Sequence, residues 1–268
     1  MHGFSTRLGG LTTVYRGHDL NLGFTKQDSH SAVQRNREIF LQQLGAAQNG
    51  RLWPLIMLRQ IHSDLIHSID RPPQEHLAGD GLITGTAGLL LGILTADCLP
   101  VILVDTNSRA VGIFHAGWRG TVKRIVEKGV GEMQRHFATC PSDLKAAIGP
   151  GIHKCCYEVG VDVGEQFTSQ FSYASELFYE VTESNPVRDK YPLLFLSSRP
   201  PGHTQVPKKV FLDLAEANRR QLLVAGVPSK NISVSPLCTS CRTDLLFSYR
   251  AEKGLTGRMM GAIGIRPA

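Results

Sequence analysis

Three short apolar runs that follow one another closely constrain the fold of this chain more than any other feature. They lie at residues 89–95, 100–104 and 110–115, and the segment from Asp105 to Ser108 forms a cluster of turn residues between the last two. Runs of this length, rich in Val, Ile and Leu and bounded by turn residues, are typical of buried strands. They predict the centre of a sheet that is covered on both faces.

Helical periodicity and further apolar runs surround these three strands. Apolar residues at helical spacing predict helices over 36–44, 121–136, 161–171 and 211–225. Short apolar runs predict further strands over 55–62, 64–69, 144–148, 193–196, 232–234, 246–249 and 261–265, the two strands at 55–69 being neighbours. Strands and helices alternate without a clear linker, so we expect one α/β domain with a mixed sheet over residues 1–268.

Charge and hydropathy exclude two classes of partner. The net charge of +6 is spread thinly, in doublets such as Lys208-Lys209 rather than in long runs, so we expect no nucleic-acid partner. The longest apolar stretches fall well short of the roughly 18 residues that span a membrane, and the N-terminus resembles no signal peptide, so we expect no membrane partner. The six cysteines do not suit a disulfide framework in a chain of 268 residues. They predict reduced thiols and a cytoplasmic protein.

Two histidines and one cysteine stand at the ends of predicted strands. His62 ends the strand over 55–62, His115 ends the strand over 110–115, and Cys98 follows the strand over 89–95. Two imidazoles and a thiolate are ligands that suit Zn²⁺, and three protein ligands leave the fourth position open, as in catalytic zinc sites. The alternative without a metal is that Cys98 is a small buried side chain and that the histidines are structural.

A second interpretation uses two of the same residues. Cys98 and His115 form a thiolate–imidazole pair in a cysteine hydrolase or deamidase, with Asp80 or Asp97 orienting the imidazole. Residue order does not distinguish a metal ligand from a nucleophile. A third interpretation is a binding module without catalysis, stabilised by the metal.

Several basic residues are candidates for binding an anion such as phosphate. The sequence Gly117-Trp118-Arg119-Gly120-Thr121 precedes a predicted helix, where free backbone N–H groups and Arg119 would face a ligand. The same role is open to Arg7, Arg250 and Arg258. Without anion binding, residues 117–121 are an ordinary strand–turn–helix connection and the other arginines are surface residues.

The segment 149–160 and a CxxC pair hold other reactive residues. Glu158 is a candidate general acid or base, and Tyr157 a candidate stacking partner for a flat ring. Cys238 and Cys241 form a single CxxC, and the adjacent Cys155 and Cys156 complete a second metal site only imperfectly.

Taken together, these segments resemble the YfiH-like proteins, a family described as laccase-like or as multicopper polyphenol oxidases. The resemblance runs in family order over nearly the whole chain. It rests on FSTRLGG at 4–10, LNLG at 20–23, QIH at 60–62, GDG at 79–81, TADCLPV at 95–101, HAGWRGT at 115–121, GP at 149–150, CYEVG at 156–160, CT at 238–239, FSYR at 247–250 and TGR at 256–258.

The resemblance implies a fold, a metal and a reaction. It implies a three-layer α/β/α fold, a zinc ion held by His62, Cys98 and His115, and a homodimer. The implied reaction is phosphorolysis of adenosine, inosine, guanosine or methylthioadenosine to the free base and a pentose 1-phosphate, with adenosine deamination at the same site. In these reactions Arg7, Arg119 or Arg250 would hold phosphate, and Asp80 or Glu158 would move protons.

The chain departs from what the family descriptions suggest in three places. A multicopper oxidase needs several His-x-His pairs, and the ten histidines here include no such pair, so adventitious Cu²⁺ is the expected source of any trace oxidase activity. The chain begins almost at Ser5-Thr6-Arg7, so we expect the family's preceding segment to be nearly absent and its first strand to be lost. Ala251 replaces a second basic residue after Arg250, which weakens anion binding at that turn.

Overall fold

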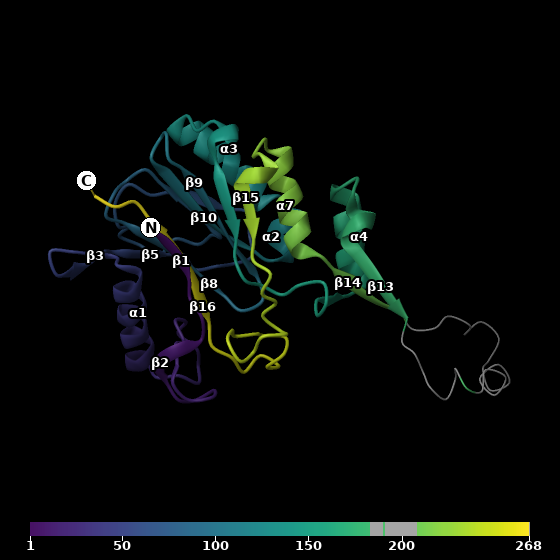
Figure 1. Cartoon of the computed structure of the whole chain (residues 1–268), viewed down its shortest axis with the longest axis horizontal. Coiled ribbons are helices and arrows are strands. Elements are labelled where there is room, and N and C mark those ends of the chain that lie inside the picture. Colours follow the sequence, from purple (N-terminus) through teal and green to yellow (C-terminus); the bar gives the residue numbers. More distant parts are fainter. Residues whose placement is uncertain (183–189, 191–207, 268) are drawn as a thin grey trace. The chain divides into compact units, whose positions relative to one another are not determined.

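The computed structural model describes residues 1–182, 190 and 208–267 (Figure 1). The chain divides into two compact units, one formed by Met1–His153 with Leu214–Ala268 and one by Lys154–Asp213. A single domain over residues 1–268 therefore stays a prediction. The strand expected over 193–196 lies outside the described residues.

The first unit contains a six-stranded sheet that carries two of the three apolar runs. Its order is β15-β11-β9-β10-β7-β6, with β9 antiparallel to both β10 and β11, and with two parallel pairs at the edges, β11–β15 and β7–β6. The strands are β6 (Ile66–Ser68), β7 (Gly81–Thr84), β9 (Leu99–Asp105), β10 (Ala110–Ala116), β11 (Lys145–Ile148) and β15 (Ile232–Val234).

A four-stranded sheet packs against the six-stranded one and carries the remaining apolar run in β8. Its order is β1-β16-β8-β5, formed by β1 (His2–Phe4), β5 (Leu55–Met57), β8 (Leu90–Thr95) and β16 (Met259–Gly264). The core between the two sheets includes Ile93, Ile102 and Ile113, one from each of the three predicted central strands. All seven residues of β10 are buried, which is why that segment is apolar without alternation. The strand β1 leads directly into the FSTRLGG motif and shares Phe4 with it, and the expected loss of the family's first strand stays a prediction.

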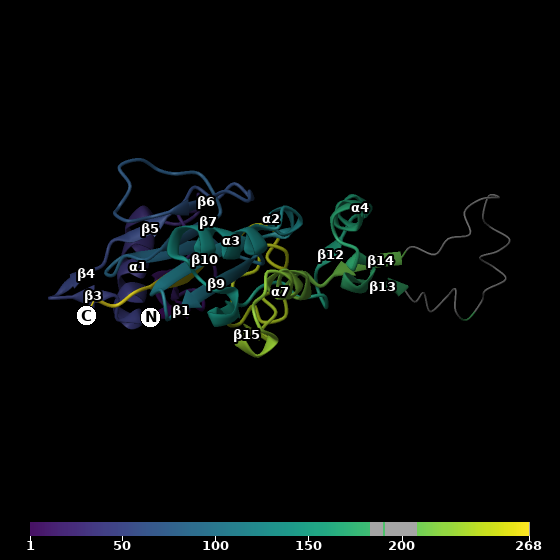
Figure 2. The same ribbon diagram turned by 90° about the horizontal axis from the view of Figure 1, so that it is seen from above.

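Helices cover the outer faces of both sheets (Figures 1 and 2). On the four-stranded sheet, α1 (His30–Leu44) packs Phe40 and Leu41 against Leu90 and Met260. On the six-stranded sheet, α3 (Ile125–Phe137) contacts β10 and β7, and α7 (Leu214–Val224) contacts β15 and β11. The α/β class with mixed sheets is confirmed, and two sheets rather than one lie between the helices of this unit.

The two strands expected at 55–69 are real but are not neighbours. β5 pairs with β8 in the four-stranded sheet, whereas β6 pairs with β7 in the six-stranded sheet. The chain crosses from one sheet to the other between them, and His62 has a φ of +56° in this crossover. Both strands are short and apolar, so composition alone gave no sign that they belong to different layers.

Two predicted helices also begin or break at unexpected places. The helix expected over 121–136 is divided into α2 (Trp118–Val122) and α3, because Arg124 has a φ of +63° that no α-helix accommodates. The start expected at residue 211 is wrong, since the strand β14 (Lys208–Leu212) continues to Leu212 before α7 begins. The strand expected over 246–249 is also wrong, since this segment has no strand and leads from a bend at Leu246 into a turn at Tyr249.

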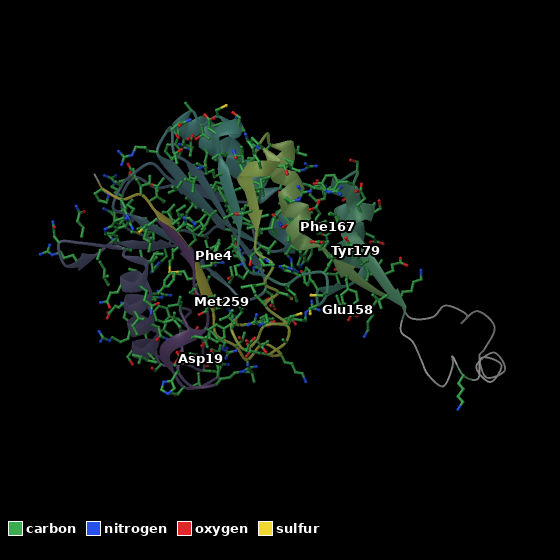
Figure 3. The ribbon with its side chains drawn as sticks, viewed as in Figure 1. Phe4, Asp19, Glu158, Phe167, Tyr179 and Met259 are labelled. Carbon is green, nitrogen blue, oxygen red and sulfur yellow. The ribbon has the colours of Figure 1, made fainter. Side chains whose placement is uncertain are left out.

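Within its described residues, the second unit holds a three-stranded antiparallel sheet and the helix α4 (Val161–Gln170). The sheet order is β12-β14-β13, from β12 (Glu158–Val159), β13 (Phe178–Thr182) and β14 (Lys208–Leu212). The helix α4 buries Phe167 against Phe171 and Phe178. Figure 3 labels Phe167, Glu158 and Tyr179 in this unit.

Smaller elements complete the described part of the chain. They are β2 (Leu8–Thr12), the hairpin of β3 (Ala47–Gln48) and β4 (Arg51–Leu52), and three 3₁₀ turns at Pro141–Asp143, Ala174–Leu177 and Ser229–Asn231. Among the described helices, none has the length and apolar character needed to cross a lipid bilayer.

Candidate metal centre

His62, Cys98 and His115 meet at one point of the first unit. A ring nitrogen of each histidine and the Sγ of Cys98 lie within 4.8 Å of one another. The strand register explains part of this, because His115 on β10 lies opposite Pro100 on β9, two residues after Cys98. His115 is buried, Cys98 is half-buried and His62 is exposed, so solvent reaches the cluster from the side of His62.

A single carboxylate orients both histidines. Asp80 Oδ1 lies 2.8 Å from His115 Nδ1, and the backbone N–H of His62 donates to the same oxygen at 3.1 Å. Ser63 donates to Oδ2 through its N–H at 2.6 Å and its hydroxyl at 2.7 Å, and Ile61 N donates there at 3.2 Å. This arrangement leaves Nε2 of His115 to bind a ligand, and it resembles the carboxylate–histidine pairs that orient metal ligands in proteins.

The electrostatics of the cluster favour a thiolate. Burial acts to raise the pKa of the Cys98 thiol, but the positive charge of His115 and hydrogen bonds from both histidines outweigh it and lower this pKa to about 6. Burial acts to lower the pKa of His115, but the Cys98 thiolate and Asp80 raise it to about 9. Despite burial, hydrogen bonds from His115 and Ser63 hold the pKa of Asp80 well below its usual range. A thiolate is the form of cysteine that binds metals or acts as a nucleophile.

Gly117 allows the next loop to approach the three ligands. A Cβ at this position would lie 2.8 Å from Cys98 Sγ and 3.2 Å from a carbon of the His62 ring. The backbone therefore passes directly over the cluster, and α2 begins at the following residue. Arg119 lies two residues further on, exposed, with its guanidinium 4.4 Å from the centre of the Trp118 ring.

Arg250 is also connected to the cluster. Its backbone N–H donates to Asp97 Oδ2 at 2.7 Å, and Asp97 is the residue before Cys98. Arg258 instead directs its guanidinium to the backbone oxygens of Thr256 and Gly257. Of the predicted anion-binding residues, Arg119 and Arg250 are thus the two whose backbones are close to the candidate ligands.

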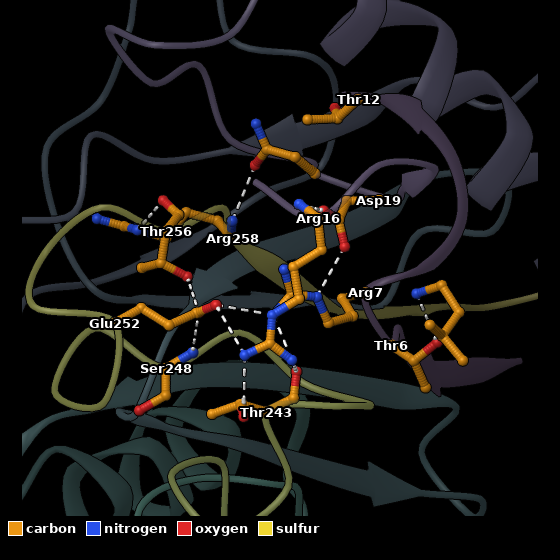
Figure 4. A network of polar contacts seen from close by, with 12 residues as sticks. Thr6, Arg7, Thr12, Arg16, Asp19, Thr243, Ser248, Glu252, Thr256 and Arg258 are labelled. Atoms are coloured by element: carbon orange, nitrogen blue, oxygen red, sulfur yellow. Dashed lines mark hydrogen bonds and ion pairs between the residues drawn. The ribbon is translucent and has the colours of Figure 1, made fainter. Parts of the chain in front are cut away.

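Arg7 lies in a different environment, a buried ionic network shown in Figure 4. Its guanidinium is 2.7 Å from Asp19 and 2.8 Å from Glu252, donates to the oxygen of Thr243, and lies 4.4 Å from the centre of the Phe247 ring. The residue is 1% exposed. A phosphate contact by Arg7 stays a prediction, and the geometry favours Arg119 and Arg250 for this role.

Two other candidates belong wholly or partly to the second unit. Glu158 lies on β12, and its role as a general acid or base stays a prediction. Cys155 and Cys156 belong to the second unit while Cys238 and Cys241 belong to the first, so a second metal site formed by both pairs also stays a prediction.

The structure shows which carboxylate bonds to His115, and it identifies supporting residues that the sequence did not indicate. Asp80, not Asp97, is the carboxylate that bonds to His115 in the described part of the chain. Ser63 was not predicted to hold Asp80, and the anchoring of Asp97 by Thr239 and Ser248 was not predicted either. Glycines on both sides of Asp80 were the one sequence signal of a closely packed carboxylate.

Three curated proteins are similar to this chain over most of its length. The purine nucleoside phosphorylase YlmD of Geobacillus stearothermophilus is 34% identical, with 98% of this chain and 92% of that protein aligned. A purine nucleoside phosphorylase of Deinococcus radiodurans is 36% identical over 98% of this chain and 88% of that protein. A protein of an unknown prokaryotic organism named adenosine deaminase RL5 is 37% identical over 78% of this chain and 74% of that protein.

Solved structures and a family match agree with these relatives. The hypothetical protein YfiH of Bacillus licheniformis superposes with a TM-score of 0.82 and 33% identity, over 99% of this chain and 92% of that one. The resemblance to YfiH-like proteins is confirmed. The family described as "Multi-copper polyphenol oxidoreductase laccase" matches residues 1–266, and the chain belongs to this family of enzymes.

Proposed function

We propose that this chain is a zinc-dependent purine nucleoside phosphorylase. Its substrates would be adenosine, inosine, guanosine or methylthioadenosine together with phosphate, and its products the free base and a pentose 1-phosphate. The observation that carries the proposal is the convergence of His62, Cys98 and His115 within 4.8 Å beside Asp80. The names of the relatives at 31–36% identity support the reaction.

The donor set fits zinc better than the copper centres that the family description suggests. Tetrahedral zinc binds nitrogen at about 2.0–2.1 Å and sulfur at about 2.3 Å, and catalytic sites keep three protein ligands. The three donor atoms lie close enough for this geometry after small side-chain movements. A multicopper oxidase would need several further histidines, and the sequence has no His-x-His pair.

Each of the residues around the cluster would have its own role in phosphorolysis. A phosphate oxygen forms a bond to C1′ of the sugar while the bond from C1′ to the purine nitrogen breaks, and its electron pair leaves with the base, which then takes a proton. Arg119 and Arg250 would bind and orient the phosphate. Asp80 would hold His115 and His62 in place. When bound, the zinc ion would supply Lewis-acid stabilisation of negative charge on the departing base. Glu158 remains our proposal for the proton donor.

Two other activities have specific support. Adenosine deamination at the same site is favoured by the relative named adenosine deaminase. A cysteine hydrolase is favoured by the low pKa of about 6 for the Cys98 thiol beside His115. A chelator distinguishes the zinc-dependent activities from a cysteine hydrolase, because it should abolish the former and leave the latter active. A thiol alkylator should inhibit the hydrolase without any loss of metal.

The direct experiment measures hypoxanthine released from inosine, with and without phosphate, together with the zinc content. We expect phosphate-dependent release in the wild type and none in Cys98→Ala, which should also lose its zinc. Cys140→Ala is the matched control, because Cys140 is an exposed thiol that contacts Ser142. Full turnover by a metal-free Cys98→Ala protein would refute the proposal.

Other properties implied by the resemblance belong to the same proposal. We propose a homodimer, a single catalytic domain over residues 1–268 and a cytoplasmic location. Bound Cu²⁺ in place of zinc would account for any trace oxidase activity.

A further inference from the structure

Asp97 has an unusual backbone next to a candidate metal ligand. It precedes Cys98 in the turn between β8 and β9, and its φ is +86°, which is in the left-handed region. A residue with a side chain adopts this region at a cost, and such residues concentrate at functional sites. The side chain is buried, so the surrounding structure must offset the free-energy cost of a buried carboxylate as well as that of a strained backbone.

The compensation comes from three chain segments that bond to Asp97. Its Oδ1 accepts from the hydroxyls of Thr239 at 2.6 Å and Ser248 at 2.7 Å, and its Oδ2 accepts from the backbone N–H of Arg250 at 2.7 Å. Its backbone oxygen accepts from the N–H of Ile152 at 2.8 Å. One residue therefore ties the loops after β11 and β15 and the turn at 248–251 to the turn that carries Cys98.

The bond to Arg250 has a consequence for ligand binding. Ser248, which is itself bonded to Asp97, also accepts from the N–H of Ala251 at 3.1 Å, so the turn at 248–251 is fixed both internally and by Asp97. A charged acceptor strengthens such bonds relative to neutral ones. Glu252 Oε2 also accepts from the N–H of Ser248 at 3.1 Å, but Asp97 is the carboxylate that joins this turn to the turn of Cys98.

We propose that Asp97 is a positioning residue that holds the Arg250 turn against the Cys98 turn and thereby sets the affinity for the anionic co-substrate, inorganic phosphate. Asp97 itself contacts neither metal nor phosphate in this account. The inference rests on the proposed function, because it takes Arg250 as a phosphate ligand.

The opposite end of β9 provides a matched control. Asp105 ends β9, is buried like Asp97, and accepts from the Ser108 hydroxyl at 2.7 Å and from the N–H groups of Asn107 and Ser108. It caps a turn in the same way but is not bonded to the Arg250 turn. Removing Asp105 should therefore reproduce the loss of stability without any change in anion binding.

The test compares three variants with the wild type. Asp97→Gly removes the carboxylate and also relieves the left-handed backbone, so it isolates the lost hydrogen bonds. Asp97→Asn is the conservative variant, because its oxygen can still accept from Arg250 while its amide donates to the two hydroxyls. Asp105→Gly is the control. Each protein, loaded with zinc, is measured for inorganic phosphate binding by calorimetry and for hydrogen exchange at residues 248–251.

We expect Asp97→Gly to weaken phosphate binding about tenfold or more and to lose exchange protection at residues 248–251. Asp97→Asn should recover most of both, and Asp105→Gly should bind phosphate like the wild type. Phosphate binding by Asp97→Gly within about twofold of the wild type, or equal weakening in Asp105→Gly, would overturn the inference. If the wild type binds no phosphate, the proposed function fails. Hydrogen exchange still decides whether Asp97 holds the turn, since unchanged protection in Asp97→Gly would overturn it.

Discussion

Two buried carboxylate clusters in the first unit have opposite consequences. Around Asp80, a fully buried carboxylate bonds to Nδ1 of His115 and to the backbone of His62, and a ring nitrogen of each histidine lies within 4.8 Å of Cys98 Sγ. Around Arg7, two carboxylates and a backbone oxygen bond to Nε and Nη1 of the guanidinium, while its buried Nη2 has no hydrogen-bond partner among the described residues. The comparison teaches that a buried charge builds a binding site only where several ligand atoms converge on one point that solvent can reach.

The largest expected effect comes from removing a ligand beside Asp80. His62→Ala and Cys98→Ala each leave two protein ligands, too few for a stable site, so zinc should be lost and turnover should fall by about 10³-fold or more. Metal analysis and nucleoside turnover check this. Retention of zinc by both variants would mean that the Asp80 cluster is no more a metal site than the Arg7 cluster.

The next effect concerns the stability of the Arg7 cluster. Arg7→Met leaves Asp19 and Glu252 buried without their partner, which should reduce the free energy of unfolding by roughly 3–5 kcal/mol. Since Arg7 also holds Glu252, which accepts from the N–H of Ser248, phosphate binding by the folded protein should weaken no more than in Asp97→Gly. Urea unfolding and phosphate titration measure the two quantities separately, and an Arg7→Met protein of unchanged stability that no longer binds phosphate would reverse our assignment.

A smaller effect is expected from Asp80→Asn. The amide cannot satisfy three backbone donors and orient His115 as the carboxylate does, so zinc affinity should fall by about 10–100-fold. Competition with a chromogenic chelator measures it. The variant Asp105→Asn, at a buried carboxylate that is not bonded to either histidine, should leave zinc affinity at the wild-type value.

The smallest effect is a pH dependence of the metal-free protein. The pKa of Cys98 is lowered to about 6, so its contribution to stability is present at high pH and is lost as pH falls through about 6. The pKa of His115 is raised to about 9, so its contribution is present at low pH and is lost as pH rises through about 9. The pair should therefore stabilise the protein most between these values.

The ultraviolet absorbance of the thiolate tests the lower limit of this window. Its midpoint should lie near pH 6 in the metal-free wild type, and the matching stability change should be absent in Cys98→Ala. A midpoint at the ordinary value for a free thiol would mean that His115 and Cys98 do not interact as described.

The central strands and the metal ligands were predictable from sequence, whereas the partners of the ligands were not. Apolar runs without alternation mark β8, β9 and β10, because both faces of each strand are covered. His62, Cys98 and His115 stand out in the sequence because each is a reactive side chain at or near the end of an apolar run. The prediction that His62 ends a strand is wrong, since β5 ends at Met57 and His62 lies in the crossover after it. The role of Asp97 depends on contacts with residues more than 140 positions away, and no local pattern encodes them.

Neither the separation of β5 and β6 into two sheets nor the partners of the buried carboxylates were predictable, and the physical reason is the same. Local propensity indicates a strand or a charged side chain, but it does not indicate the sheet that the strand joins or the residue that the side chain contacts. Arg7 in its Ser-Thr-Arg motif has the same local appearance as an anion-binding arginine, and only the fold brings Asp19 and Glu252 to it.

X-ray absorption at the zinc edge tests the central claim most directly. The zinc-loaded wild type should show one sulfur neighbour at about 2.3 Å and two imidazole nitrogens at about 2.0–2.1 Å, and the sulfur signal should disappear in Cys98→Ala but persist in Cys140→Ala. A spectrum without sulfur, or one with several sulfur neighbours that survives the loss of Cys98, would contradict the account.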